Sequence, residues 1–288
     1  MKGILLAGGS GSRLRPLTLG VNKHLLPIHD RPMIHHPLAL LMLAGIRQVA
    51  LISNPGDLPA FEKLLGNGAD LGLEISYLAQ PRPAGIAEAY GLAASFLAAE
   101  PSVLILGDNL FWGEGTVKLL PQAIADPRGA TLFCRRHTRP EHFAVLDCDA
   151  SGQPLRIEEK PKQPQSPWVV TGLYVCDGQA PSLASTIKPS ARGELEITDL
   201  LDLYLAEGSL RWRALPSEDF WCDAGTWEGW HEANAQVAAL QHQQGLIACP
   251  EQIAYRAGWI DKQALLQQAQ LMANSDHARH LLSLAQQF

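Results

Sequence analysis

The 288-residue sequence lacks a regular cysteine pattern, a long apolar run and an excess of positive charge. Its five cysteines contain no Cys-x-x-Cys pair and are odd in number, which argues against a disulfide framework and a zinc site. The histidine groups His35-His36 and His277…His280 show no metal-ligand spacing, so we expect surface or core residues there. No stretch approaches the ~20 apolar residues of a transmembrane helix. With no targeting segment after Met1, these absences predict a cytoplasmic protein.

Positive charge is also scarce, since 23 Lys and Arg against 29 Asp and Glu give a net charge of −6. This balance argues against bulk binding to nucleic acid or to an anionic membrane, so neither partner is expected. Any phosphate that the chain binds must therefore be held by a local cluster of residues. A content of 47% hydrophobic and 18% charged residues excludes a disordered chain, and the glycines follow no fibre repeat.

Short apolar runs alternate with segments of helical period over residues 1–110. The expected strands cover residues 4–7, 49–52, 73–78 and 103–106, and the expected helices cover 32–44, 57–65 and 84–98. This alternation is typical of right-handed βαβ units and a parallel sheet that is buried on both faces. Ligands bind such sheets at the carboxyl ends of the strands, where a glycine-rich loop and Asp108 both fall.

The remaining chain predicts a second region and a helical end. Strands are expected at 130–133, 144–148 and 169–175, followed by a helix over 193–205. After Trp230 the composition is rich in Ala, Gln and Leu and contains no good strand. We therefore expect a core over residues 1–230 and a helical appendage over 231–288 that serves oligomerisation or regulation.

The loop that follows the first strand is the strongest functional signal. Glycines at positions 8, 9 and 11 let backbone N–H groups approach an anion, and a nest or helix N-terminus adds a positive field. Arg13 adds a planar fork for phosphate oxygens, and Lys23 adds a mobile point charge. The loop is not a Walker A motif, because no Gly-Lys-Ser/Thr closes it, and it is not a dinucleotide fingerprint, because Leu14 occupies the third glycine position. An ordinary strand-to-helix turn is the alternative, and the two cations argue against it.

Two aspartates occupy turns beside small residues, in Gly107-Asp108-Asn109 and in Trp221-Cys222-Asp223-Ala224-Gly225. A carboxylate at a strand end is where an oxygen-ligated Mg²⁺ is held against substrate phosphates. Taken alone, each aspartate is more often a turn residue or a helix cap. Their combination with the phosphate loop predicts a metal site formed by Asp108 and Asp223.

Several longer motifs occur together in one order along the chain. They are Gly-Gly-x-Gly-x-Arg-Leu-x-Pro-x-Thr, Lys-x-Leu-Leu-Pro, Leu-Gly-Asp-Asn, Glu-Glu-Lys-Pro, Val-Thr-Gly-Leu-Tyr, Arg-Gly-Glu-Leu-Glu-Ile-Thr-Asp and Trp-x-Asp-x-Gly-Thr. In these motifs, from residue 1 to at least 260, the chain resembles the sugar-1-phosphate nucleotidylyltransferases, most of all the bacterial glucose-1-phosphate thymidylyltransferases. The resemblance implies a three-layer α/β/α nucleotidyltransferase (Rossmann-like) core, a mostly parallel central sheet and a C-terminal helical appendage.

The resemblance also implies a reaction, in which dTTP and α-D-glucose 1-phosphate give dTDP-glucose and pyrophosphate with Mg²⁺ as cofactor. It implies a nucleotide-binding part over about 1–110, a sugar-binding part over about 111–230, and a homo-oligomer, a tetramer in this family. By similarity, the site residues are Arg13, Lys23 and Asp108 for catalysis, Leu6, Gly8, Gly9, Gly11, Gln80 and Gly85 for the nucleotide, Ala144, Glu159, Lys160, Val170 and Arg192 for the sugar phosphate, and Asp108 and Asp223 for the metal.

Three positions depart from the family pattern. Ala84 stands where aspartate is common, Glu88 where glutamine is usual, and Ala144 where glycine is usual. These departures leave room for another pyrimidine triphosphate or an amino-sugar phosphate as substrate. They also leave room for a non-catalytic nucleotide-sensing subunit, although the intact set of Arg13, Lys23 and both aspartates argues against it.

Overall fold

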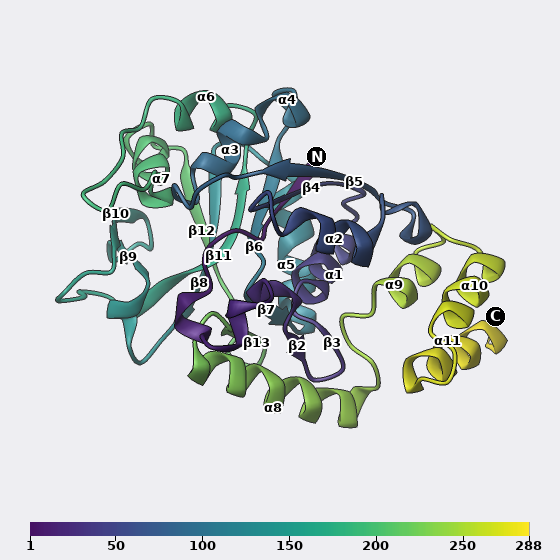
Figure 1. Cartoon of the computed structure of the whole chain (residues 1–288). Helices are drawn as coiled ribbons and strands as arrows, with labels where there is room; N and C mark the ends of the chain where they lie inside the picture. Colours follow the sequence, from purple (N-terminus) through teal and green to yellow (C-terminus); the bar gives the residue numbers. More distant parts are fainter. Residues whose placement is uncertain (288) are drawn as a thin grey trace.

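A nine-stranded sheet runs through the centre of the molecule, and the computed structural model describes residues 1–287 (Figure 1). The strand order is β10-β9-β11-β6-β1-β4-β5, and β8 pairs with both β11 and β12. Only β10 and β11 oppose the common direction, so the sheet is mostly parallel. The nine strands are β1 (Lys2–Leu6), β4 (Gln48–Ser53), β5 (Glu74–Ala79), β6 (Ser102–Leu106), β8 (Ala130–Arg136), β9 (Ala144–Cys148), β10 (Pro154–Glu159), β11 (Trp168–Cys176) and β12 (Leu210–Ala214).

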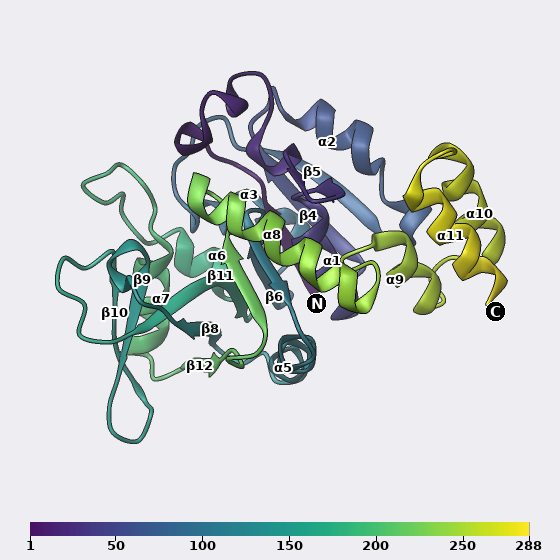
Figure 2. The same cartoon turned by 90° about the horizontal axis from the view of Figure 1, so that it is seen from below.

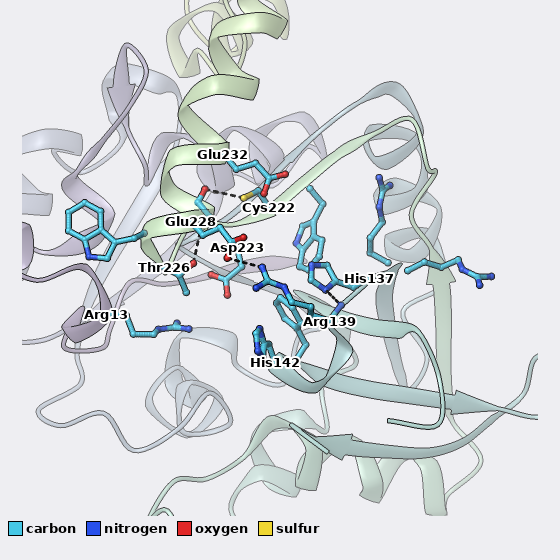
Figure 3. Close-up of a pocket in the computed structure, with 15 residues that line it drawn as sticks. Arg13, His137, Arg139, His142, Cys222, Asp223, Thr226, Glu228 and Glu232 are labelled. Atoms are coloured by element: carbon cyan, nitrogen blue, oxygen red, sulfur yellow. Dashed lines mark hydrogen bonds and ion pairs between the residues drawn. The ribbon is translucent and has the colours of Figure 1, made fainter. Parts of the chain in front are cut away.

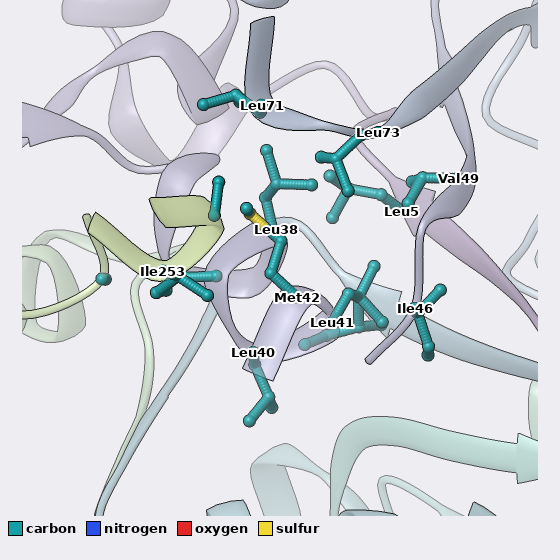
Figure 4. Close-up of a cluster of buried hydrophobic side chains, with 14 of the residues drawn as sticks. Leu5, Leu38, Leu40, Leu41, Met42, Ile46, Val49, Leu71, Leu73 and Ile253 are labelled. Carbon is teal, nitrogen blue, oxygen red and sulfur yellow. The ribbon is translucent and has the colours of Figure 1, made fainter. Parts of the chain in front are cut away.

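Apolar side chains on both faces of this sheet explain why its strands are apolar runs. In β1, Ile4 and Leu6 point into one buried cluster, and Leu5 between them points into the other. Figure 4 shows Leu5 beside Leu38 and Leu41 of α1. Each face requires a covering layer of helices, because an uncovered apolar face would remain in water.

Helices supply both layers. On the face of Leu5 lie α1 (His35–Leu43), α2 (Leu58–Leu65) and α5 (Glu114–Ala125). On the face of Ile4 lie α3 (Glu88–Leu92), α4 (Ala94–Leu97), α6 (Ala180–Ala184) and α7 (Ile197–Ala206). Short 3-10 turns complete the connections: η1 (Ser12–Leu14), η2 (Leu17–Leu19), η3 (Lys23–Leu25), η4 (Ala69–Leu71) and η5 (Pro140–His142). The predicted three-layer α/β/α core with a mostly parallel sheet is confirmed.

Two small antiparallel sheets lie outside the central one. β2 (Pro27–Ile28) pairs with β3 (Arg31–Pro32), and β7 (Asn109–Trp112) pairs with β13 (Phe220–Asp223). The second pair joins segments more than a hundred residues apart and places Asp223 opposite Asn109. Sequence periodicity predicts neither β7 nor β13, and this pairing positions the candidate site.

The C-terminal end is helical, as expected. α8 (Trp227–Gln244) crosses the molecule below the sheet and packs on β2 and β13 (Figure 2). α9 (Pro250–Arg256), α10 (Lys262–Leu271) and α11 (Asp276–Gln286) form a group beside α1 and share its apolar cluster. Over residues 1–287, no helix combines the length and apolar character that a membrane crossing requires.

Three expected helices begin three or more residues later than predicted, and the one expected from residue 32 begins at His35 because Pro32 belongs to β3. The helix expected over 84–98 begins at Glu88 and is divided into α3 and α4, and the helix expected from Gly193 begins at Ile197. The residues that precede α3 and those that precede α7 instead contact each other through their backbones. The N–H of Leu195 donates to the carbonyl of Ala84 at 2.7 Å, and Gly85, with φ of +103°, packs against the Leu195 backbone. Residues held in this backbone contact cannot also form a first helical turn.

Candidate active site

The loop after β1 has the positive φ angles that its glycines predict. Gly9 and Gly11 adopt φ of +93° and +59°, backbone angles that residues with a side chain rarely adopt. The loop leads into the short 3-10 turn η1 rather than into an α-helix. The loop therefore offers backbone groups and Arg13 to a ligand, and the field of a long helix is not part of this site.

Lys23 and Asp108 form a buried ion pair at the carboxyl end of the sheet. Lys23 Nζ contacts Asp108 Oδ2, and the two side chains are only 13% and 10% exposed. Lys23 opens η3, which the Asn22 side chain caps by accepting the N–H of His24. Burial by itself would raise the pKa of Asp108, but the charges of Lys23 and His24 and the hydrogen bonds from Lys23 and Asn109 together lower that pKa below its usual value.

Asp223 lies beside this pair, at the end of β13. A Cβ built on Gly225 would lie 2.8 Å from Asp108 Oδ2, 2.9 Å from Asp223 Oδ1 and 3.0 Å from Arg13 Nη2, so the three side chains converge on one small volume. The N–H of Gly225 donates to Asp223 Oδ1 at 2.8 Å. Burial, and then the charge of Asp108, raise the pKa of Asp223 above its usual value.

A cavity of about 290 Å³ extends from these carboxylates toward Gln80. Gln80 is buried, and its Nε2 donates to Glu88 Oε2 at 2.7 Å. A Cβ on Gly8 would overlap Gln80 Oε1, so the glycine leaves space for this amide. The predicted site residues that line the cavity are Leu6, Gly8, Gly9, Arg13, Lys23, Gln80, Gly85, Asp108, Glu159, Lys160 and Arg192.

A second cavity, of about 200 Å³, borders Asp108 as well and also reaches Asp223. Its lining includes the predicted residues Arg13, Asp108, Ala144, Glu159, Lys160, Val170 and Asp223. Glu159 Oε1 lies 3.0 Å from Lys160 Nζ and 3.4 Å from Arg192 Nη2. Arg192 also holds Glu196 Oε2 at 2.7 Å, so a ligand must compete with a carboxylate for that guanidinium.

A third cavity, of about 560 Å³, adjoins Asp223 and is lined by Arg13 and by further basic residues that the sequence motifs do not predict (Figure 3). Its lining includes Arg13, Arg135, Arg136, His137, Arg139 and His142. Arg139 Nη2 contacts Glu228 Oε2 at 2.7 Å. The run Arg-Arg-His-Thr-Arg at 135–139 was the available signal, since it is a strongly basic stretch in an acidic chain.

Comparison with known proteins identifies the family. The family described as Nucleotidyl transferase matches residues 2–239. A glucose-1-phosphate thymidylyltransferase of Neisseria meningitidis is 47% identical over 285 residues, which cover 99% of each chain. The enzyme of the same name from Mycobacterium tuberculosis is 42% identical over 287 residues, with 99% of each chain covered. The chain belongs to the nucleotidyl transferase family.

Solved structures agree with this nucleotidyl transferase assignment. A Bacillus anthracis protein, assigned as a glucose-1-phosphate thymidylyltransferase and solved with sucrose, superposes with a TM-score of 0.77 at 38% identity, covering 82% of this chain and 94% of its own. A UDP-glucose pyrophosphorylase solved with UDP-glucose gives a TM-score of 0.71 at 20% identity and covers 83% and 98% of the two chains. The second likeness concerns the fold alone.

Within residues 1–287, the three cavities together include every predicted site residue except Gly11. Gly11 faces Thr18 instead, whose hydroxyl donates to the Gly11 carbonyl at 2.7 Å. The predicted residues therefore lie together in space, although which of them contact substrate stays a prediction. Trp227 lines the third cavity, whereas Trp230 packs in the core and donates its Nε1 to the Pro27 carbonyl at 3.1 Å.

Nucleotidyl transferases generally use a divalent metal ion, and the residues of this site fit one. Asp108 and Asp223 supply hard carboxylate oxygens of the kind that such ions prefer. The raised pKa of Asp223 means that a buried carboxylate is left short of positive charge. A bound dication would correct that shortage.

Proposed function

We propose that the protein transfers a thymidylyl group from dTTP to α-D-glucose 1-phosphate and releases pyrophosphate. One observation carries the proposal. The side chains of Arg13, Asp108 and Asp223 converge beside Gly225, and Lys23 forms an ion pair with Asp108. Asp108 and Arg13 line both of the smaller cavities. Phosphoryl-type transfer requires positioning and charge stabilisation rather than a protein nucleophile. A set of two carboxylates and two cations between two substrate cavities meets that requirement.

In the proposed mechanism, an oxygen of the sugar phosphate attacks the α-phosphorus of dTTP in line, and pyrophosphate leaves. Asp108 and Asp223 would hold Mg²⁺, which neutralises phosphate charge when it is bound. Lys23 stabilises the charge that grows around the α-phosphate, and Arg13 binds the departing pyrophosphate through its planar fork. Lys23 must then move between its ion pair with Asp108 and the substrate phosphate.

The two smaller cavities divide the substrates. We assign the pyrimidine to the cavity of Gln80 and Gly85, in the part built by residues 1–110, and the sugar to the cavity of Glu159 and the Val170 backbone, in the part built by 111–230. Lys160 and Arg192 line the nucleotide cavity close to Glu159 and would hold the sugar phosphate. Leu6, Gly8, Gly9 and Gly11 would shape the path of the triphosphate.

The alternatives differ in substrate or in class. Glu88 fixes the Gln80 amide and Ala144 lines the sugar cavity, so both bear on which pyrimidine and which sugar are accepted. Pyrophosphate release should be measured with four nucleoside triphosphates, each combined with glucose 1-phosphate and with an amino-sugar phosphate. The proposal expects the highest kcat/KM for dTTP with glucose 1-phosphate. Measurable dTTP binding without any nucleotide-sugar product would instead support a sensing subunit.

We also propose that the chain acts as a homo-oligomer in the cytoplasm, a tetramer by its family. Leu271 in α10 and Leu282 in α11 are 77% and 43% exposed, which leaves apolar surface on the helices expected to build an interface. A second copy of the chain would cover that surface. Light scattering at micromolar concentration should give a mass above that of one chain, and a strict monomer would contradict the assembly.

A further inference from the structure

A cluster of three potential metal ligands lies outside the active site, where the C-terminal helices meet the core. Cys249 is the residue before α9, Glu251 lies in the first turn of α9, and His277 lies in the first turn of α11. Their ligand atoms all lie within 4.8 Å of one another. Cys249 Sγ is 3.3 Å from Glu251 Oε2, which is 3.4 Å from His277 Nε2.

The two distances from Glu251 Oε2, 3.3 Å to Cys249 Sγ and 3.4 Å to His277 Nε2, are close to the edges of a tetrahedral coordination shell. Zinc binds thiolate sulfur at about 2.3 Å and imidazole nitrogen or carboxylate oxygen at about 2.0–2.2 Å, which sets ligand-to-ligand edges of about 3.3–3.6 Å. A thiolate, a carboxylate and a neutral imidazole form a mixed donor set that suits a borderline ion such as Zn²⁺. The alternative is a triad held only by hydrogen bonds, with the thiol donating to Glu251.

A second observation points to a missing partner in this region. The Nε2 atoms of His277 and His35 are buried, and neither has a hydrogen-bond partner among residues 1–287. His35 belongs to α1, which packs directly on α9. Buried polar atoms are nearly always paired, so the unpaired nitrogen of His35, and that of His277 with only its 3.4 Å contact to Glu251, need an explanation.

The local charge balance also allows a dication. A thiolate and a carboxylate neutralise Zn²⁺ completely. The nearby guanidinium of Arg31 is held by Asp30, with Nε–Oδ1 and Nη2–Oδ2 distances of 2.9 and 2.7 Å, and its Nη1 is buried without a hydrogen-bond partner among residues 1–287. Access is also available, because the side chains of His277 and Glu251 are 20% and 11% exposed.

We propose that Cys249, Glu251 and His277 bind a structural zinc ion, with the fourth position on the side of His35. The ion would tie α9 and α11 to each other and to α1, and so fasten the C-terminal helices to the core. The histidine and cysteine spacings give no hint of this site, because its three ligands come from the starts of two helices, α9 and α11, that meet only in the fold. The expectation that His35 and His277 are ordinary surface or core residues stays a prediction, and the zinc site is the alternative to it.

Cobalt substitution of the full-length protein tests the proposal most sharply, because a thiolate ligand gives Co²⁺ an intense near-ultraviolet charge-transfer band. The carboxylates of the active site cannot produce that band. We expect one equivalent of Co²⁺ to develop it, Zn²⁺ to displace the cobalt, and zinc to raise the unfolding temperature. The absence of the band in the unaltered protein would overturn the proposal.

Variants assign the ligands. Cys249→Ser should abolish the band, and His277→Gln should weaken zinc binding at least tenfold in a chelator competition. His280→Gln is the matched control on the same helix, since that imidazole contacts Gln252 Oε1 at 2.6 Å, and Cys148→Ser is the control thiol. Both controls should retain the band and the affinity. A band that persists in Cys249→Ser would contradict the assignment, and if that variant does not fold, the spectrum of His277→Gln decides.

Discussion

The ammonium group of Lys23 contacts the carboxylate of Asp108 across 85 residues of sequence, and Asp223 lies beside the pair. The surroundings of the two aspartates consequently shift their pKa values in opposite directions. Against the effect of burial, Lys23 lowers the pKa of Asp108, whereas burial and then the charge of Asp108 raise the pKa of Asp223. Without a bound cation, ionised Asp108 therefore stabilises the fold and ionised Asp223 destabilises it.

Replacing each aspartate by asparagine should separate stability from activity. Both Asp108→Asn and Asp223→Asn should lower turnover by at least about 10²-fold, because a neutral amide binds Mg²⁺ poorly. In metal-free protein at neutral pH, Asp223→Asn should raise the melting temperature and Asp108→Asn should lower it, by about 2–4 °C for each kcal/mol. Scanning calorimetry and the pyrophosphate assay measure the two effects.

The pH dependence of these melting temperatures follows from the directions of the two pKa shifts. For Asp223, whose folded pKa is raised, the favourable contribution is full below the unfolded pKa and is lost as pH rises through the folded pKa. For Asp108, whose folded pKa is lowered, the contribution is present above the unfolded pKa and is lost as pH falls. The gain from Asp223→Asn should therefore shrink on acidification. A gain that grows as pH falls would refute the assignment.

Gly8→Ala should impair nucleotide binding through Gln80. A methyl group at Gly8 would overlap Gln80 Oε1 and displace the amide that we assign to the pyrimidine. We expect KM for dTTP to rise by about tenfold, the scale of 1.4 kcal/mol, with a smaller change in kcat. Gly20→Ala is the matched control, because a Cβ there meets nothing within 4 Å. Equal kinetics for the two variants would show that the amide position is unimportant.

Glu88 should act by orienting Gln80. Its Oε2 accepts the Gln80 Nε2 at 2.7 Å, which fixes which amide atom faces the base. Glu88→Ala should reduce the preference for dTTP over a purine triphosphate, because the freed amide can flip. Glu88→Gln retains an acceptor oxygen and should keep most of that preference. The ratio of kcat/KM values for the two triphosphates reports the change, and an unaltered ratio in Glu88→Ala would remove Glu88 from selectivity.

The sequence predicts the central sheet because a strand buried on both faces must be an apolar run, as in residues 4–7 and 103–106. It also predicts the phosphate loop, because glycine accepts the positive φ found at Gly9 and Gly11 at lower cost than residues with a Cβ. It does not predict the pairing of β7 with β13, since these strands lack strong period-2 alternation and meet only through the tertiary fold. For this reason the two aspartates were predicted as ligands by chemistry, without the contact that brings them together.

The start of α3 and the basic cavity show the same limitation. The alanine-rich segment from Ala84 has high helix propensity, yet its first residues are held by the backbone of Leu195. The cations at 135–139 are adjacent in sequence, but their position beside Asp223 depends on how β8 and β13 are placed. Contacts between distant segments decide both features, and local patterns do not encode them.

Arg13 should contribute through the shape of its guanidinium as well as through its charge. It borders all three cavities and its Nη2 is close to both aspartates. Arg13→Ala should lower kcat by roughly 10²–10³-fold, the effect of losing one preorganised donor. Arg13→Lys should recover little, because a point charge cannot reproduce the fork across two phosphate oxygens. Full recovery by lysine would show that charge alone is required.

The kcat of Lys23→Ala tests the central claim most directly, which is that the cluster around Asp108 stabilises the transferring phosphate rather than only binding dTTP. Steady-state kinetics with dTTP and glucose 1-phosphate at saturating Mg²⁺ should give a kcat roughly 10²–10³-fold below that of the unaltered protein. An interaction made only in the transition state lowers kcat, whereas a ground-state interaction raises KM alone. An unchanged kcat with a raised KM for dTTP would contradict the account and make Lys23 a binding residue.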